Sequence, residues 1–392
     1  MTIALPAPVQ AETPTKTIKA LDLFAGTGWG VACQRLGIHE DGVEIMPEAI
    51  ATRAANGMST IYNDVWEGLQ DAEHTHGYYN LLIASPPCQT FSMAGSGSGR
   101  AALDDVLAAI AAGAYKDVAD LHALGEATDP RTALVLTPLA HVWRDYPEYV
   151  VFEQVPPVLP VWEACAEVMR ERGYSVWTGV LNAEQYGVPQ TRRRAILIAK
   201  LFGEAKPPTP THSRYYPKAQ TRRDPGVLPW VSMAAALGWV GERGATLVAN
   251  DRLANSARRH ESAPAPTITG GHDRDNRVWQ ADRPTWPFEK PSSTVVGSFS
   301  PEIIAGPGGS GTRPTDLSKH RQDRPDSVKV AASEAAVLQS YPADFIWDAP
   351  VPNGRGGSKP MPKTKKFLMI GNAVPPLLAE AILRAVLTEL RA

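Results

Sequence analysis

Short, nearly continuous runs of apolar residues recur along the first half of the chain. They lie at residues 19–24, 81–84, 149–152 and 195–199, separated by longer stretches with helical patterns or turn residues. Runs of this length, bounded by turns, are typical of strands that are buried on both faces of a parallel sheet. The pattern therefore predicts an α/β protein, whose chemistry is expected at the carboxyl ends of the strands.

The first apolar run leads into a glycine-rich turn that contains Gly26 and Gly28 and then into a helical stretch ending near Leu36. Such a turn lets backbone N–H groups approach a ligand at the positive end of a helix, which predicts a nucleotide-type cradle. The full G-x-G-x-x-G pattern is absent, because bulky Trp29 occupies the third position. We therefore expect an adenosine ligand without a pyrophosphate.

Two acids follow the next predicted strands and suit such a ligand. Glu44 ends the strand at residues 42–45 and would reach ribose hydroxyls, although an N-cap or surface role is the alternative. Asp64 follows a third short strand and would accept a hydrogen bond from an adenine amino group.

A cysteine follows two prolines where the apolar run 81–84 ends, in the sequence Ser85-Pro86-Pro87-Cys88. The prolines fix two φ angles and bias the preceding residues toward extended backbone, so the thiol is held in place. The alternative is a small buried hydrophobe, the usual role of a free cysteine. Polar neighbours and the glycine- and serine-rich residues 95–99 favour an exposed loop and a nucleophile instead.

Composition limits the class of protein. With 392 residues, 43% hydrophobic and 20% charged, the chain can form one large domain and a smaller one, and no apolar run approaches the about 18 residues of a membrane span. Three scattered cysteines predict neither disulfides nor a metal site. Residues 1–16 are expected to be a disordered lead-in without a signal-peptide pattern. We therefore expect a cytoplasmic protein. The net charge is −2, but basic residues cluster at 192–194, 222–223, 258–260 and 363–366. Each cluster is either a phosphate contact or, more often, a solvated face.

Six short blocks, in order along the chain, resemble those of the DNA cytosine-5 methyltransferase family. They are the first block (residues 22–28), the catalytic block (85–89), the glutamate block (152–156), the arginine block (190–194), the penultimate block (334–342) and the last block (371–375). The resemblance implies a mixed, mainly parallel Rossmann-like methyltransferase sheet. It also implies transfer of a methyl group from S-adenosylmethionine to carbon 5 of a cytosine in double-stranded DNA.

The resemblance also implies the catalytic residues. Cys88 matches the thiolate that attacks carbon 6, and Glu153 the carboxyl group that relieves charge at N3. Arg194 is expected at the cytosine carbonyl oxygen and Arg192 in orienting the loop, with Arg193 solvated. A duplex target must first be flipped out of the stack, and residues 91–99 would form the lid.

The implied cofactor site draws on both ends of the chain. Phe24 would stack on the adenine, with core packing as the alternative, and Asn372 with Ala373 would close the site, with a turn role for Asn372 as the alternative. The full expected set is Phe24, Gly26, Gly28, Glu44, Ile45, Asp64, Pro86, Asn372 and Ala373.

Two positions depart from the family pattern. Gln154 stands where the glutamate block usually has asparagine, and Trp29 stands where a second glycine is frequent. Neither change removes a reacting group, and we expect position 154 to brace the loop.

The expected domains are a catalytic domain at 17–200, a target recognition domain at 201–326 and a segment at 327–392 that completes the catalytic domain. Side chains that read bases or contact phosphates would come from Arg222, Arg223, Asn250, Arg252, Arg258, His272 and Arg274. We expect a monomer with a role in restriction-modification or phage self-protection. Two alternatives stay open: methylation of tRNA cytosine, and a non-catalytic DNA-binding homologue.

Overall fold

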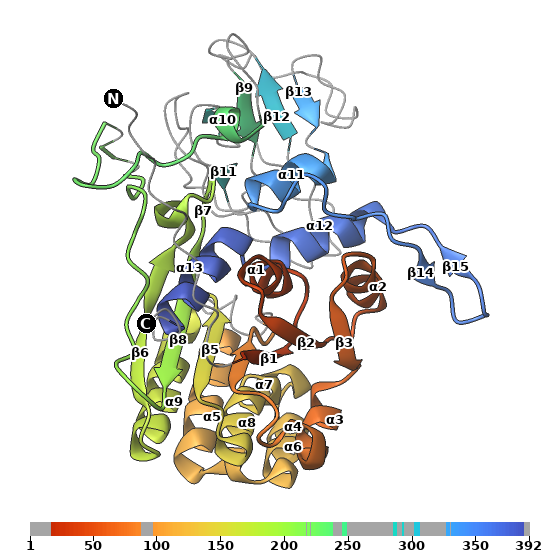
Figure 1. Ribbon diagram of the computed structural model, residues 1–392, viewed down its shortest axis with the longest axis vertical. Coiled ribbons are helices and arrows are strands. Elements are labelled where there is room, and N and C mark those ends of the chain that lie inside the picture. Colours follow the sequence, from red (N-terminus) through yellow and green to blue (C-terminus); the bar gives the residue numbers. More distant parts are fainter. Residues whose placement is uncertain are drawn as a thin grey trace, which may run out of the picture.

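A seven-stranded sheet forms the centre of the molecule, with strand order β3-β2-β1-β4-β5-β8-β6 (Figure 1). The computed structural model describes residues 17–87, 97–216, 218–219, 221–237 and 331–387, and the strand segments 245–248, 285–287, 292–293, 302–305 and 327–329. The central strands are β1 (Lys19–Leu23), β2 (His39–Val43), β3 (Ser59–Tyr62), β4 (Leu81–Ala84), β5 (Tyr149–Gln154), β6 (Ser175–Asn182) and β8 (Arg193–Lys200). The first five strands in the sheet order are parallel to one another, and β8 is antiparallel to both β5 and β6. The predicted mixed, mainly parallel sheet is confirmed.

The four apolar runs located β1, β4, β5 and β8, with small shifts at their ends, whereas no run predicted β6. β4 coincides with the predicted run, whereas β2 ends at Val43, so that Glu44 follows the strand. β5 continues two residues beyond its apolar run, because Glu153 and Gln154 pair with Ile196 and Ala195 of β8. The apolar run 149–152 predicted that Glu153 would follow the strand. Glu153 is instead the penultimate residue of β5.

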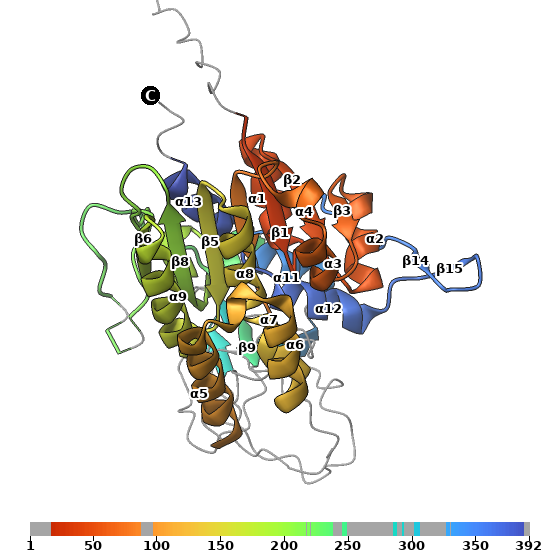
Figure 2. The same cartoon turned by 90° about the horizontal axis from the view of Figure 1, so that it is seen from below.

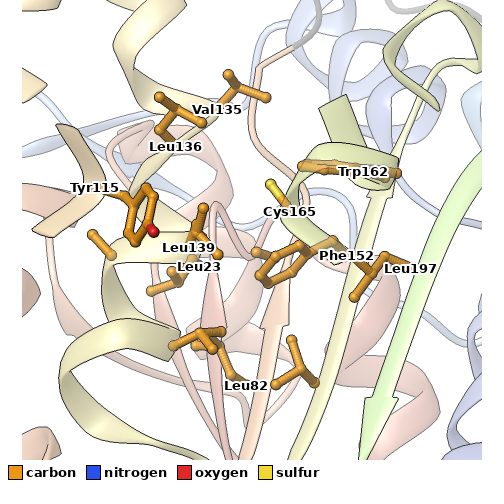
Figure 3. Packing of buried hydrophobic residues seen from close by; sticks show 14 of the residues in the cluster. Leu23, Leu82, Tyr115, Val135, Leu136, Leu139, Phe152, Trp162, Cys165 and Leu197 are labelled. Atoms are coloured by element: carbon orange, nitrogen blue, oxygen red, sulfur yellow. The ribbon is translucent and has the colours of Figure 1, made fainter. Parts of the chain in front are cut away.

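Helices cover both faces of the sheet (Figures 1 and 2). Because successive strand residues point to opposite faces, Leu82 and Phe152 belong to one core cluster, and Ile83 and Val151 to another. Figure 3 shows the first cluster, in which Trp162 and Cys165 lie close to Phe152. The helices on that side are α3 (Val65–Gln70), α4 (Ala72–Thr75), α5 (Gly97–Ala112), α6 (Val118–Ala127), α7 (Pro130–Leu134), α8 (Thr137–Asp145) and α9 (Leu159–Glu171). The 3-10 turn η1 (Ala114–Lys116) connects α5 to α6, and η2 (Pro156–Val158) connects β5 to α9. A further 3-10 turn, η3 (Ala183–Tyr186), follows β6 and packs on the opposite face.

The opposite face is covered by α1 (Gly28–Leu36) and by α13 (Pro376–Val386), which come from the two ends of the chain. A third cluster joins α2 (Pro47–Ala55) to α10 (Met233–Leu237), α11 (Ala332–Leu338) and α12 (Lys363–Asn372). Among the described residues, the stretch Lys363–Val386 is long and apolar enough to cross a membrane, but 67% of its apolar 18-residue window is buried inside the protein. It consists of α12 and α13, whose buried side chains belong to these two clusters.

A second, four-stranded sheet has the order β10-β9-β12-β13. Its strands are β9 (Ala245–Val248), β10 (Thr285–Pro287), β12 (Glu302–Ala305) and β13 (Ser327–Lys329), and they lie within or beside the segment expected to recognise the target. The short strand β11 (Ser292–Ser293) pairs instead with β7 (Gln190–Thr191), directly before the arginines of the arginine block. A small hairpin, β14 (Val351–Pro352) and β15 (Ser358–Lys359), projects away from the sheet in both views (Figures 1 and 2). The proposed domain limits stay predictions.

Candidate active site

The carboxyl ends of β1, β4 and β5 lie side by side at one edge of the central sheet. Leu23 pairs with Ala84, Ala84 pairs with Phe152, and the backbone N–H of Ser85 donates to the carbonyl of Leu23 at 3.2 Å. This register places Phe24, the Ser85-Pro86-Pro87 segment and Glu153 along the same edge. Cys88 lies outside the described residues, as do residues 91–96 of the lid expected at 91–99 and the lead-in at 1–16, whereas residues 97–99 of that lid begin helix α5.

The catalytic acid expected from the sequence pairs with one of the expected arginines. Nε of Arg194 lies 2.7 Å from Oε1 of Glu153, and both side chains are about nine-tenths buried or more. A second guanidinium nitrogen of Arg194, Nη1, donates to the carbonyl of Arg193 at 2.8 Å. Charge-assisted bonds of this kind are short and directional, so the carboxyl group is held in one orientation.

The three arginines of the arginine block alternate between buried and exposed positions. Arg192 is 1% exposed and Arg194 is 8% exposed, whereas Arg193 between them is exposed. The carbonyl of Arg192 accepts a bond from the N–H of Ala183 at 2.8 Å, which fixes the backbone just before β8. Two arginines buried at one sheet edge are expensive to desolvate, and this cost is typical of functional positions.

Both departures from the family pattern contact the segment that leads to Cys88. The indole N–H of Trp29 donates to the hydroxyl of Ser85 at 2.9 Å. The side-chain amide of Gln154 donates to the carbonyl of Pro86 at 2.5 Å. The first helix and the end of β5 therefore hold consecutive residues of the same loop.

The glycine-rich turn is closed by Glu44, which follows the neighbouring strand β2. One carboxylate oxygen accepts the N–H of Gly26 at 2.9 Å, and the other accepts the N–H of Met46 at 2.8 Å. Phe24 and Gly26 have positive φ values of 60° and 49°, a conformation that is uncommon for a non-glycine residue such as Phe24. Glu44 is thus neither a helix cap nor a simple surface acid, and each of its oxygens retains a lone pair for a further donor.

Three further residues expected to bind the cofactor differ in their exposure and in their contacts. Ile45 is 71% exposed, an unusual position for a large apolar side chain next to a polar loop. Phe24 is half-buried against the main core cluster, so the packing alternative holds for part of its ring. Asp64 caps α3 by accepting the N–H of Trp66 at 3.1 Å and stays partly exposed.

The last block packs directly onto the first block. A Cβ atom at Gly28 would lie 2.1 Å from the carbonyl oxygen of Val374, so only glycine allows this close approach. Thr27 and Tyr341 share a buried hydroxyl–hydroxyl bond of 2.6 Å. Burial raises the pKa of Tyr341, so its hydroxyl stays protonated and able to donate.

Gln339 joins three of the blocks, a role that the sequence reasoning missed. Its oxygen accepts from Nε2 of Gln190 at 2.6 Å, and its Nε2 donates to the carbonyls of Ile370 and Ala373 at 3.0 and 2.8 Å. Asn372 is exposed at the end of α12. The only available signal was that Gln190 and Gln339 lie inside recognised blocks, since their pairing spans 149 positions.

Other expected residues lie away from this edge or outside the described part. The guanidinium groups of Arg222 and Arg223 lie over the rings of Tyr216 and Trp230, at 4.1 and 4.7 Å. The other candidates for base or phosphate contact lie outside the described residues: Asn250, Arg252, Arg258, His272 and Arg274. Cys33 and Cys165 are buried free thiols, and the described residues contain no metal-binding group of His, Cys, Asp or Glu side chains.

Comparisons with known proteins agree with this geometry. A family model described as C-5 cytosine-specific DNA methylase matches residues 18–111 and 123–388. The type II methyltransferase M1.HphI of Haemophilus parahaemolyticus is 28% identical over 389 residues, covering 94% of this chain and 86% of its own. Two solved structures share the fold at 16% identity: Dnmt2 methyltransferase of S. pombe, with a TM-score of 0.54, and a putative E. coli prophage DNA modification methyltransferase, with 0.53. Each similarity covers 95% of this chain and 99% of the other. The chain thus belongs to the C-5 cytosine-specific DNA methylase family and is a DNA (cytosine-5)-methyltransferase.

Proposed function

We propose that Cys88, Glu153, Arg192 and Arg194 are the catalytic set, with the thiolate of Cys88 attacking carbon 6 of the target cytosine. The observation that supports this assignment is the ion pair of 2.7 Å between Arg194 and Glu153, at the sheet edge where the Ser85-Pro86-Pro87 segment begins. A thiolate is needed because carbon 5 is a poor nucleophile until a bond at carbon 6 turns the ring into an enamine.

Glu153 supports this attack from the other side of the base. Formation of the sulfur–carbon bond pushes an electron pair into the ring, and a proton held between the Glu153 carboxyl group and N3 neutralises the charge. Arg194 fixes Oε1 of that carboxyl group, so we propose that Oε2 faces the base while the guanidinium reaches the cytosine carbonyl oxygen. Arg192 orients the catalytic loop. After methylation, loss of the carbon 5 proton expels the cysteine and restores the aromatic ring.

We propose that the glycine-rich turn holds S-adenosylmethionine, and the residues present fit it. Glu44 has free lone pairs for ribose hydroxyls, Asp64 has a partly exposed carboxylate for the adenine amino group, and the exposed face of Ile45 is available to an apolar ring. The space beside the α-carbon of Gly26 is open to 4 Å. When bound, the sulfonium supplies the electrophilic methyl group. The full set is Phe24, Gly26, Gly28, Glu44, Ile45, Asp64, Pro86, Asn372 and Ala373.

We propose duplex DNA as the preferred acceptor and a flipped-out cytosine as the reacting base. Residues 201–326, which contain β9, β10 and β12 of the four-stranded sheet, supply the bulk that a duplex-reading module needs. Acting as a monomer in the cytoplasm, the enzyme would protect host or phage DNA against a nuclease. The relative from Haemophilus parahaemolyticus, a type II methyltransferase, supports this role.

Transfer of tritium from labelled S-adenosylmethionine to duplex DNA and to tRNA tests the acceptor. We expect labelling of the duplex alone, and tRNA labelling would favour the alternative. A Cys88→Ala protein should label nothing, and DNA containing 5-fluorocytosine should form a stable covalent complex with the wild type only. Bisulfite sequencing of DNA from an expressing strain would identify the recognition sequence.

A further inference from the structure

Arg53 of α2 is completely buried, yet it belongs to no block that the sequence singles out. Its guanidinium donates through Nη2 to Oε1 of Glu40 at 2.6 Å and to the carbonyl of Ser59 at 2.5 Å, and through Nε to the hydroxyl of Thr60 at 3.0 Å. These partners come from β2 and β3. The side chain is therefore fixed on the inner side of the strands that border the glycine-rich turn.

The remaining nitrogen of this guanidinium reaches the turn itself. Nη1 donates to the carbonyl of Gly26 at 3.3 Å, while the N–H of Gly26 donates to Glu44 at 2.9 Å. The backbone carbonyl and N–H of Gly26 are therefore both bonded to side chains from outside the turn, Arg53 and Glu44. Gly42 provides the room, because a Cβ atom there would lie 2.2 Å from Nη2 of Arg53.

A second buried acid completes the cluster. Asp22 of β1 is fully buried, and neither of its carboxylate oxygens has a donor among the described residues. Burial raises its pKa well above the ordinary value, and the charge of Glu40 raises it further. The raised pKa favours the protonated form of Asp22 beside Glu40, whose carboxylate pairs with Arg53.

The geometry points to Arg53 as a positioning residue for the S-adenosylmethionine site, which fixes the carbonyl of Gly26 while Glu40 compensates its charge. This inference rests on the proposed function of the turn. A buried ion pair is not required for stability, since apolar residues of similar volume commonly replace one without loss. Such residues cannot replace the bonds of Arg53 to the carbonyls of Gly26 and Ser59 or to the hydroxyl of Thr60, and only the first of these bonds reaches the turn.

The variant that separates the two roles is Arg53→Met combined with Glu40→Leu, which removes the pair and leaves no unpaired charge. We expect this protein to fold, with an unfolding temperature lowered by the carbonyls of Gly26 and Ser59 that lose their donor. Its dissociation constant for S-adenosylmethionine, measured by calorimetry, should rise about tenfold. We expect kcat at saturating S-adenosylmethionine and KM for DNA to change less than about twofold. Amide hydrogen exchange at residues 26–28 of the ligand-free protein should accelerate.

Arg35→Met, which removes a partly exposed arginine 3.7 Å from Glu380, is the matched control and should leave the dissociation constant unchanged. A folded double variant that binds S-adenosylmethionine as tightly as a binding-competent wild type overturns this inference and leaves the proposed function intact. A wild type that fails to bind S-adenosylmethionine removes both. If the double variant does not fold, Arg53→Lys serves instead, because it keeps the charge but shortens the reach, and unchanged affinity in that protein also overturns the inference.

Discussion

Trp29 and Ser85 form a hydrogen bond of 2.9 Å that joins the first helix to the segment preceding Cys88. Trp29 is 1% exposed and packs in the cluster between α1 and the sheet, so its indole is a rigid anchor. An aromatic residue at a position where glycine is frequent in the family thereby gains a direct contact with the catalytic loop.

Removing the acceptor tests this contact. Ser85→Ala leaves the indole N–H of Trp29 buried without its partner, at a cost of about 1–3 kcal/mol in the free energy of unfolding. We expect kcat to fall severalfold, measured by methyl transfer to duplex DNA. In the double variant Trp29→Phe with Ser85→Ala, no donor is left unsatisfied, so part of the stability should return. If both proteins are equally destabilised, the bond has no energetic role.

Gln154 provides a second test at the same loop. Gln154→Leu removes the side-chain amide and with it the donor to the carbonyl of Pro86. We expect kcat to fall about tenfold, since a misplaced nucleophile loses effective concentration, while KM for S-adenosylmethionine stays within about twofold. Gln154→Glu is the control, because a carboxylate cannot donate to the carbonyl and should be at least as damaging. Full activity in Gln154→Leu would show that the loop needs no support there.

The pair of Arg194 and Glu153 has separable roles in stability and catalysis. Arg194→Ala leaves a buried carboxylate without its cation, which typically costs about 3–5 kcal/mol in stability. Activity should fall at least about a hundredfold because the carboxyl group loses its orientation. Adding Glu153→Ala should restore part of the stability, measured by urea unfolding, but none of the activity. Recovery of activity in the double variant would contradict the assignment.

Glu184 in η3 predicts a pH-dependent stability. Burial raises its pKa from 4.5 to about 7, so the folded protein holds a proton that the unfolded chain releases. The stability linked to this group is fully present below about pH 4.5, falls as the pH rises toward 7 and then levels off, by about 3 kcal/mol in total.

Glu184→Gln should remove this dependence. Its free energy of unfolding, measured in urea from pH 4 to pH 8, should match the wild type at pH 4 and exceed it above pH 7. A constant difference between the two proteins across this range would mean that Glu184 does not titrate on unfolding.

The sequence alone determined the fold class and where the site residues lie along the strands. Buried strands need continuous apolar runs, so 81–84 matched β4 without error and the Ser85-Pro86-Pro87 segment follows it. The strand expected at 42–45 instead ends at Val43, before Glu44. The six blocks identified the family because each carries residue types that its chemistry requires. The resemblance to the family blocks also predicted that Gln154 braces the loop. In the structure, its side-chain amide donates to the carbonyl of Pro86.

Only the tertiary structure decided which of these residues meet. The end of β5 was misplaced because the ladder with β8 lengthens the strand, and pairing across the sheet cannot be read from apolar runs. The bond between Gln190 and Gln339 and the approach of Val374 to Gly28 join positions that are remote in the chain. The burial of Arg53 could not be predicted from the sequence, because a single arginine in a short helix has the pattern of a surface residue. Its burial depends on two residues of the neighbouring strand β2, because Glu40 supplies the opposite charge and Gly42 the space.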